Sequence, residues 1–294
     1  MANVLEVKNL TKSFKRNPWS KPKEVLHNIS FSLSQGVMTG FLGINGSGKT
    51  TTIKCVLDLI TPEKGEIKFF GEKISRNIKK RIGYLPEKPQ LYDHLSGGEF
   101  LDFAIKLSRN NISTSNVESE KKIDEILELV DLKHAKEARL REYSKGMYQR
   151  MGLAQAIIRN PELVILDEPM SDLDPAGRSL VKDILKRIQS EKKVSIFISS
   201  HLLQDIEDLC PEIVILNQGE MKYTGKTLSF INKLNPKFDI TFEDKNNFKT
   251  VSVDSEESLQ AEIDKLRSQK TNIITIQNQK SLEEAFKSFI GKDF

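Results

Sequence analysis

One short stretch strongly limits how this chain can fold: Gly43-Ile44-Asn45-Gly46-Ser47-Gly48-Lys49-Thr50, followed by Thr51. The apolar run Val37 to Leu42 before it predicts a buried strand. Apolar residues after it recur with helical spacing, at Ile53, Val56, Leu57 and Ile60. A glycine-rich turn between a strand and a helix lets backbone N–H groups wrap phosphate oxygens, and the helix N-terminus adds its positive end. The stretch therefore predicts a phosphate-binding P-loop.

Two side chains of the stretch suit a nucleoside triphosphate. Lys49 can reach the β- and γ-phosphates, and the Thr50 hydroxyl can ligate Mg²⁺. We expect the whole run to bind the nucleotide, that is Gly43, Asn45, Gly46, Ser47, Gly48, Lys49, Thr50 and Thr51. An ordinary glycine-rich turn is the alternative, and the full motif in a strand-to-helix context disfavours it.

Length and charge limit the remaining choices. The 294 residues fit one large domain, or one large and one small domain. The net charge of +4 gives no general field for a polyanion, so we expect no nucleic-acid partner. Cys55 and Cys210 lie far apart, which indicates buried thiols rather than a metal site. No run of eighteen apolar residues occurs, so any membrane-spanning part is expected in another polypeptide.

Several segments predict a parallel sheet with helices on both faces. Short apolar runs occur at Leu163–Leu166, Val194–Ile198 and Ile213–Leu216, and a polar residue follows each of them. Helical segments alternate with these runs along the chain. Leu5, Val7, Phe31 and Leu33 mark alternating strands, and 65–71 reads as a glycine-bounded hairpin strand. Residues 86–158 predict a helical insertion, with apolar spacing at Phe100, Phe103, Ala104 and Leu107 and at Ile123, Ile126, Leu127 and Val130, around a Ser/Asn-rich loop at 110–119.

The remaining segments carry weaker signals. From about Leu228 onward, alternating strands and two helical patterns predict a small α+β appendix, with a capping box at Ser281 and Glu284. Residues 15–23 form a polar loop whose lysines are interpreted as solvated surface. The basic run 76–81 suits phosphates or lipid headgroups, and a solvated helix face is the favoured interpretation.

Two carboxylates follow the first apolar run after the insertion. Asp167 and Glu168 stand at the C-terminal end of the strand, the edge at which open α/β sheets bind ligands. Asp167 would hold Mg²⁺ through water, and Glu168 would polarise the water that attacks the γ-phosphate. His201 ends the next apolar strand, so it can hydrogen-bond the γ-phosphate and that water.

With these motifs in order, residues 4–226 resemble the nucleotide-binding subunit of an ATP-binding cassette (ABC) transporter, and more narrowly the ATPases of bacterial ABC-2-type exporters. The resemblance implies an α/β P-loop NTPase fold: a RecA-like parallel sheet core with antiparallel β and helical subdomains. We expect this domain at 4–228, its helical subdomain at about 86–158, and a C-terminal accessory domain at 229–294. It implies ATP and Mg²⁺ as cofactors.

The resemblance also assigns roles to single residues. Phe14 matches the aromatic that stacks on adenine, although the bare sequence also allows a core residue. Glu87 stands where many relatives have the Q-loop glutamine, and with Thr50 and Asp167 it completes the implied Mg²⁺ ligands. His201 matches the switch histidine. Tyr143-Ser144-Lys145-Gly146-Met147 matches the signature motif, whose Ser144 and Gly146 would face a γ-phosphate bound to the other subunit.

One residue departs from the family pattern, and one stretch resembles a family motif but stands in the wrong place. Ser171 to Asp174 matches the D-loop, but Asp172 stands where a small residue is usual; Asp174 is expected to be near the nucleotide. Leu95-Ser96-Gly97-Gly98-Glu99 is closer to the common signature LSGGQ, but it lies too far from the Asp167–Glu168 strand. We expect it to form a turn and a helix N-terminus.

The sequence thus predicts the ATPase of a bacterial exporter. Two copies, or one copy and a second ABC ATPase, would enclose two ATP molecules and drive a membrane-spanning permease. The subunit would lie at the cytoplasmic face of the cell membrane, and the permease would dock near residues 87–107. Two alternatives stay open: a soluble ABC ATPase acting on ribosomes or DNA, and an importer ATPase.

Overall fold

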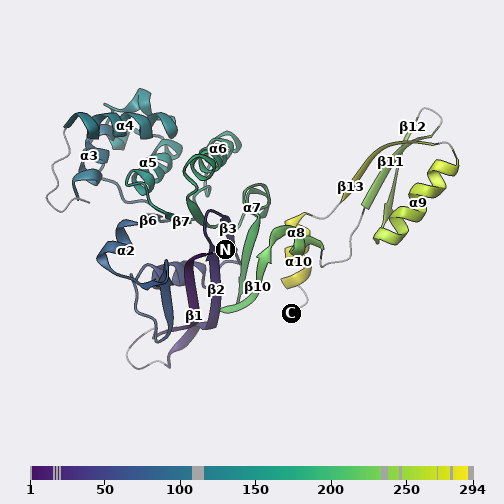
Figure 1. Cartoon of the computed structure of the whole chain (residues 1–294), viewed down its shortest axis with the longest axis horizontal. Helices are drawn as coiled ribbons and strands as arrows, with labels where there is room; N and C mark the ends of the chain where they lie inside the picture. The colour runs from purple at the N-terminus through teal and green to yellow at the C-terminus, as the bar shows by residue number, and fades with distance from the viewer. Residues whose placement is uncertain are drawn as a thin grey trace. The chain divides into compact units, whose positions relative to one another are not determined.

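The computed structural model describes residues 2–15, 17, 19, 21–107, 116–232, 238–244, 247–269, 271–278 and 281–290. They form two compact units, Met1–Thr224 and Gly225–Phe294 (Figure 1). Parts of two predicted loops, at 16, 18 and 20 and at 110–115, lie outside the described residues. Within the ranges described, none of the helices is both long enough and apolar enough to cross a lipid bilayer.

A six-stranded sheet forms the centre of the first unit, in the order β10-β9-β3-β8-β7-β6. Its strands are β3 (Met38–Leu42), β6 (Ile82–Leu85), β7 (Leu163–Asp167), β8 (Ser195–Ser199), β9 (Glu212–Asn217) and β10 (Glu220–Lys226). The strands from β9 to β6 in this order pair in parallel, as the continuous apolar runs predict. Every residue of β3, β7 and β8 is buried, so both faces of the sheet are covered.

A second, antiparallel sheet in this unit has the order β2-β1-β4-β5. Its strands are β1 (Asn3–Phe14), β2 (Lys23–Ser34), β4 (Lys64–Phe69) and β5 (Glu72–Lys73). Three aromatic rings join the two sheets: Phe41 of β3 stacks on Phe197 of β8 at 5.0 Å, and Phe31 of β2 lies 5.7 Å from Phe197. This packing fixes the antiparallel sheet beside the strand that leads into the P-loop.

Two short helices connect strands of the two sheets, the first leading from β3 to β4 and the second from β5 to β6. α1 (Lys49–Val56) ends earlier than the apolar spacing predicts, since Leu57 caps it and Ile60 lies beyond. α2 (Arg76–Lys80) contains most of the basic run, and its neighbour Arg81 is committed to protein contacts. The Arg81 guanidinium lies 3.7 Å from the Phe70 ring centroid and donates to Glu162. Arg81 therefore links the Phe70 ring to Glu162.

The helical insertion contains α3 (Gly97–Leu107), α4 (Asn116–Leu129) and α5 (Lys145–Ile157), with short 3₁₀ turns at Lys133–Ala135 and Leu140–Glu142. Figure 1 shows the three α-helices grouped together. In α3 the prediction is partly wrong: Phe100 and Ala104 are buried, but Leu107 is 65% exposed. Leu101 and Ile105 are buried instead, because the inward face of α3 is rotated by one residue.

A short antiparallel contact, centred on the bridge between Ser96 and Arg139, joins the two ends of the part of the insertion that contains α3 and α4. Residues 93–98 run antiparallel to 136–141, through backbone hydrogen bonds from Arg141 to Asp93, Leu140 to Leu95, Gly97 to Ala138 and Gly98 to Lys136. Ser96 and Glu99 form a capping box, in which each side chain accepts from the other residue's N–H, at 3.2 and 2.8 Å. The Leu95–Glu99 stretch is thus a turn and helix start, as predicted.

Two further helices complete the first unit. α6 (Pro175–Lys192) begins at Asp174, whose carboxylate accepts from the Gly177 N–H at 2.8 Å. α7 (Leu203–Leu209) lies against α6, and Lys182 of α6 pairs with Asp205 at 3.1 Å and Asp208 at 2.8 Å. These ion pairs fix the helix that follows His201.

The second unit has the α+β composition that its sequence predicts. It contains α8 (Thr227–Asn232), β11 (Phe238–Asp244), β12 (Asn247–Val253), α9 (Glu256–Ser268), β13 (Asn272–Asn278) and α10 (Leu282–Ile290). The antiparallel sheet has the order β12-β11-β13, and Ile240 and Phe242 of β11 pack against Ile263 and Leu266 of α9. The Ser281 hydroxyl accepts from the Glu284 N–H at 3.2 Å, so it caps α10.

Candidate nucleotide-binding site

The glycine-rich stretch forms a turn between β3 and α1, as predicted. Gly46 and Gly48 have positive φ angles of 81° and 108°, the region that glycine enters without strain. At Gly43 an ideal Cβ would lie 2.4 Å from the carbonyl oxygen of Leu216 and from the Ser47 hydroxyl. No side chain fits there, so the backbone of the turn stays closely packed on β9.

A cavity of about 500 Å³ opens beside this turn. It is lined by Val25, Asn45, Gly46, Ser47, Gly48, Lys49, Thr50, Thr51, Glu87, Glu168, Ser171 and His201. The structure therefore brings the P-loop together with three side chains that the sequence assigned to the same site, Glu87, Glu168 and His201. Ser47 is buried, and its hydroxyl has no hydrogen-bond partner within the described part of the chain. A buried oxygen of this kind fits a phosphate ligand.

Lys49 points back across the turn. Its Nζ donates to the carbonyl oxygen of Gly43 at 2.7 Å and lies 4.0 Å from Oε1 of Glu168. Burial lowers the pKa of Lys49, and the nearby carboxylates of Glu168, Asp167 and Glu87 oppose this shift. The ammonium is thus desolvated and held among anions, where it is poised to exchange protein oxygens for phosphate oxygens.

Asp167 is the last residue of β7 and is 1% exposed. Its Oδ1 accepts from the Ser199 hydroxyl at 2.6 Å, and the Thr50 side chain hydrogen-bonds it as well. Burial raises the pKa of Asp167, and these two hydrogen bonds act in the opposite direction. Asp167 lies behind the cavity wall, next to Thr50.

Glu168 follows in an unusual backbone conformation, with φ at 51°. Its N–H donates to the Ser199 hydroxyl at 3.0 Å, which anchors the turn to the neighbouring strand β8. Its Oε2 lies 2.7 Å from Nδ1 of His201. The two strand ends that the sequence placed side by side therefore meet through these two side chains.

The residues around Thr50 fit a magnesium ion by their chemistry. Mg²⁺ prefers oxygen ligands, usually one or two from the protein together with phosphate oxygens and water. Here the Thr50 hydroxyl and the Glu87 carboxylate line the cavity, and the buried Asp167 carboxylate hydrogen-bonds Thr50. A cation would also neutralise the desolvated Asp167.

The signature and D-loop residues line a different cavity of about 480 Å³ in the same unit. Its lining includes Ser144, Lys145, Gly146, Asp172 and Asp174. Ser144 caps α5 by accepting from the Met147 N–H at 3.3 Å. Most of the predicted site residues are thus divided between two cavities of one unit, a P-loop cavity and a signature cavity, and Phe14, Gly43 and Asp167 line neither.

Phe14 lies in neither cavity lining. It ends β1, is 43% exposed, and has the Lys12 ammonium 5.2 Å from its ring centroid. Its exposed ring excludes the alternative of a core residue. Val25 lines the P-loop cavity although its sequence context, an alternating strand, gave no ligand signal, and Ser171 of the D-loop motif lines it although no ligand role was expected for it. The anchoring role of Ser199 also has no local sequence signal.

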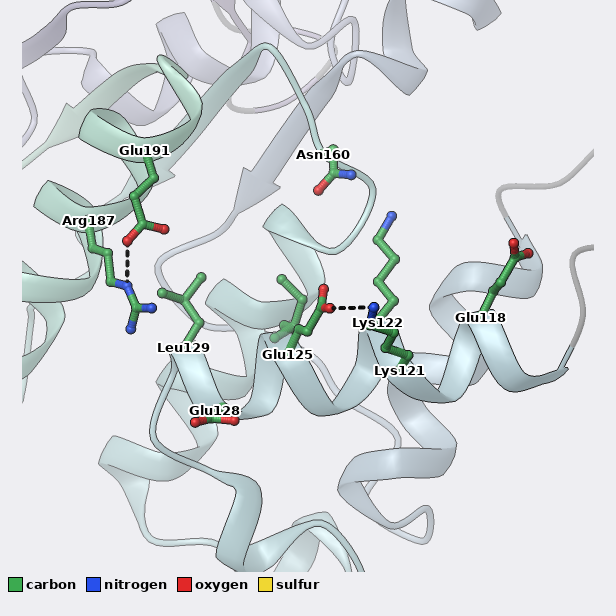
Figure 2. Close-up of a pocket in the computed structure, with 10 residues that line it drawn as sticks. Glu118, Lys121, Lys122, Glu125, Glu128, Leu129, Asn160, Arg187 and Glu191 are labelled. Carbon is green, nitrogen blue, oxygen red and sulfur yellow. Dashed lines mark hydrogen bonds and ion pairs between the residues drawn. The ribbon is translucent and has the colours of Figure 1, made fainter.

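A larger groove of about 750 Å³ lies elsewhere, between α4, α6 and the turn at Asn160. Figure 2 shows that charged side chains from both helices line it, with pairs such as Arg187 and Glu191 on one helix. It contains no P-loop residue. We therefore assign nucleotide binding to the P-loop cavity.

A parallel sheet whose central strand leads through a glycine-rich turn into a helix, with a buried lysine and a strand-end Asp-Glu pair, defines a P-loop nucleotide-binding protein. The sequence model described as "ABC transporter" matches residues 26–171. The chain is 37% identical over 75% of its length, and 69% of the relative's length, to the bacitracin transport ATP-binding protein of Bacillus licheniformis. It belongs to the ABC transporter ATP-binding protein family.

Other relatives agree with this membership. An ABC transporter ATP-binding protein of Nostoc sp. is 41% identical over 76% of this chain, and the match spans 66% of that relative. A solved structure titled as the ATP binding subunit of an ABC transporter superposes with a TM-score of 0.67, at 30% identity, over 78% of this chain and 92% of that one.

Proposed function

We propose that this chain is the ATP-hydrolysing subunit of an exporter, and that two copies enclose two ATP molecules. The observation that carries the proposal is the division of one unit into two cavities. The P-loop cavity contains Lys49, Glu168 and His201, whereas Ser144 and Gly146 line the signature cavity. A nucleotide bound at the first cavity needs a second copy to supply the signature residues.

In the proposed reaction, the P-loop N–H groups and Lys49 bind the phosphates, and Glu168 accepts a proton from the attacking water. Mg²⁺, held by Thr50, Glu87 and Asp167, would supply neutralisation of phosphate charge. His201 orients the Glu168 carboxylate through its 2.7 Å contact. Phe14 would stack on the adenine ring from the end of β1.

The proposed export direction is based on a similar protein, and the proposed membrane partner is based on an exposed aromatic surface. The relative from Bacillus licheniformis is named for bacitracin transport. On this chain, Tyr92 is 49% exposed and lies 5.2 Å from the Phe103 ring centroid, within the segment that follows Glu87. We propose that a permease helix docks on this aromatic surface and holds the subunit at the cytoplasmic face of the membrane.

Mixing two inactive variants tests the shared site. Lys49→Ala removes the phosphate-binding lysine, and Gly146→Asp blocks the signature, so each purified variant should lose ATPase activity. In a mixed dimer, one site combines the intact P-loop of one copy with the intact signature of the other. Mixing should therefore restore activity, at most to about half the wild-type rate for the mixed dimers.

Two controls complete this experiment. Mixing wild type with an excess of either variant should leave the rate per wild-type copy close to that of wild type alone, since every mixed dimer keeps one complete site. If the mixture of the two variants stays inactive although gel filtration shows mixed dimers, the composite site is wrong. If the wild type itself forms no dimer with ATP, homodimer pairing is wrong, and pairing with a different ATPase subunit replaces it.

A further inference from the structure

Asp172, which departs from the family pattern, contacts Lys145 of the signature motif. Lys145, the first residue of α5, stands in the signature motif, and Asp172 stands in the D-loop. Nζ of Lys145 lies 2.8 Å from Oδ2 of Asp172, and both residues line the signature cavity. Asp172 has a φ of 61°, a conformation that Asp and Asn tolerate better than most residues.

The charges of this pair lie beside the positive N-terminal end of α5. The first turn of α5 contains no acidic residue of its own, so its positive end is unopposed within the helix. Asp172 introduces a carboxylate from another segment into the cavity formed by that turn. An isolated negative charge there would repel the γ-phosphate of an incoming ATP.

The other charged groups of the cavity are already engaged. Asp174 accepts the Gly177 N–H as the cap of α6. Arg150 donates to the carbonyl oxygens of Val130 and Asp131 and pairs with the Asp131 carboxylate. Lys145 is thus the lining cation that offsets Asp172, and its ammonium lowers the pKa of that carboxyl, with smaller effects from Lys88 and His201.

We propose that Lys145 is a positioning residue that neutralises Asp172, so that the signature cavity can receive the γ-phosphate of ATP bound to a second copy. This inference rests on the proposed ATP-dependent dimer. The pair is exposed, at 69% and 64% for the two side chains, so its contribution to folding is small. Its effect appears when a phosphate approaches and water leaves the cavity.

The test compares three changes in a Glu168→Gln background, which should trap the ATP-bound dimer. Lys145→Ala leaves the Asp172 charge unopposed, and should weaken ATP-driven dimerisation about three- to tenfold. Asp172→Asn keeps the shape and the left-handed backbone but leaves Lys145 unopposed, and should strengthen dimerisation by a similar factor. The double variant should return close to the parent. Sedimentation velocity at low salt measures the dimerisation constants, and high salt should shrink the shifts.

The opposite signs of the single variants distinguish this proposal from its rivals. If both single variants weaken dimerisation, the pair is a structural clamp; if neither changes it, the pair has no role. If Asp172→Asn fails to rescue Lys145→Ala, Lys145 contacts the phosphate directly. Each of these results overturns neutralisation while leaving the dimer intact. If the parent itself does not dimerise with ATP, the proposed function fails, and the role of the pair fails with it.

Discussion

Nδ1 of His201 lies 2.7 Å from Oε2 of Glu168, and the His201 N–H donates to the same oxygen at 3.2 Å. Glu168 meanwhile holds a left-handed backbone, which costs on the order of 1–3 kcal/mol for a residue of this kind. A residue keeps a strained backbone conformation of this kind only where several contacts with its neighbours hold it in place. Here the ends of β7 and β8 together set the direction of the carboxylate.

Glu168→Gln should abolish most turnover and keep nucleotide binding. The amide retains the size of the side chain but cannot accept the proton, and a general base typically contributes about 10²–10⁴-fold. The single-turnover rate of ATP hydrolysis and MgATP titration of the same preparation check this. A variant that hydrolyses ATP at the wild-type rate would contradict the assignment of Glu168.

Gly146→Asp and Gly98→Asp separate the signature from the similar Leu95–Glu99 stretch. An ideal Cβ at Gly146 meets only Leu173, at 3.8 Å, so the monomer accommodates a side chain there. The variant should fold and bind ATP, but lose dimerisation and hydrolysis, because its carboxylate faces the incoming phosphate.

Gly98→Asp provides the matched control. At Gly98 the nearest atom is Cγ of Lys136 at 3.2 Å, in a flexible side chain, so the variant should lose some stability and keep its ATPase activity. Circular dichroism melting and ATPase rates of both variants decide the matter. An active Gly146 variant beside an inactive Gly98 variant would reverse the assignment.

Gly97→Ala should be more damaging to the fold than Gly98→Ala. An ideal Cβ at Gly97 lies 2.3 Å from the Tyr143 hydroxyl, which donates to the carbonyl oxygen of Ala135 at 2.8 Å. Relieving the clash must move Tyr143, directly before Ser144, and break this hydrogen bond, at a cost of about 1–3 kcal/mol. Urea unfolding of the two alanine variants measures the difference. Equal stabilities would show that Tyr143 moves freely.

Asp167→Asn should stabilise the folded protein at neutral pH while weakening its use of Mg²⁺. The pKa of Asp167 is raised from its usual 3.8, chiefly by burial. A raised carboxyl pKa favours folding when the group is protonated, and this contribution is lost as the pH rises through the folded-state pKa. The ionised carboxylate therefore costs stability at neutral pH, and an amide removes that cost. Thermal melting without added Mg²⁺ should show a higher Tm for the variant. A lower Tm would mean that the hydrogen bonds of Asp167 outweigh its desolvation.

The same raised pKa predicts how MgATP binding responds to acid. As the pH falls through the folded-state pKa of Asp167, the carboxyl becomes protonated and loses its attraction for Mg²⁺. This loss should begin at a higher pH than for a solvent-exposed aspartate. Calorimetric titration of MgATP across the acidic range measures it. Asp167→Asn, already neutral at this position, should show a flatter pH dependence.

The P-loop and the central sheet were predictable because their signals are local. The glycine spacing defines the turn, and the continuous apolar run of β7 reports burial on both faces of a parallel sheet. The left-handed backbone of Glu168 and the anchoring role of Ser199 were not predictable, because they arise where two strands meet. The exposure of Leu107 was missed for a related reason: spacing gives a helix face, but tertiary packing selects its rotation.

The contact between Lys145 and Asp172 illustrates the same limit. Asp172 alone looks like a departure from its motif, and no local pattern links the signature to the D-loop. Only the fold, which places the start of α5 beside the turn after β7, shows that the charges of Lys145 and Asp172 offset one another.

The antiparallel pairing of residues 93–98 with 136–141 has a consequence for how this subunit can change. It brings the entry and the exit of the α3–α4 excursion side by side, directly before Ser144. The length and content of the excursion can therefore vary while the geometry of the signature stays constant, as an inserted domain leaves its host undisturbed when its two ends adjoin. Insertions within this excursion should therefore change the exposed surface of α3 and α4 and leave the backbone around Ser144 as it is.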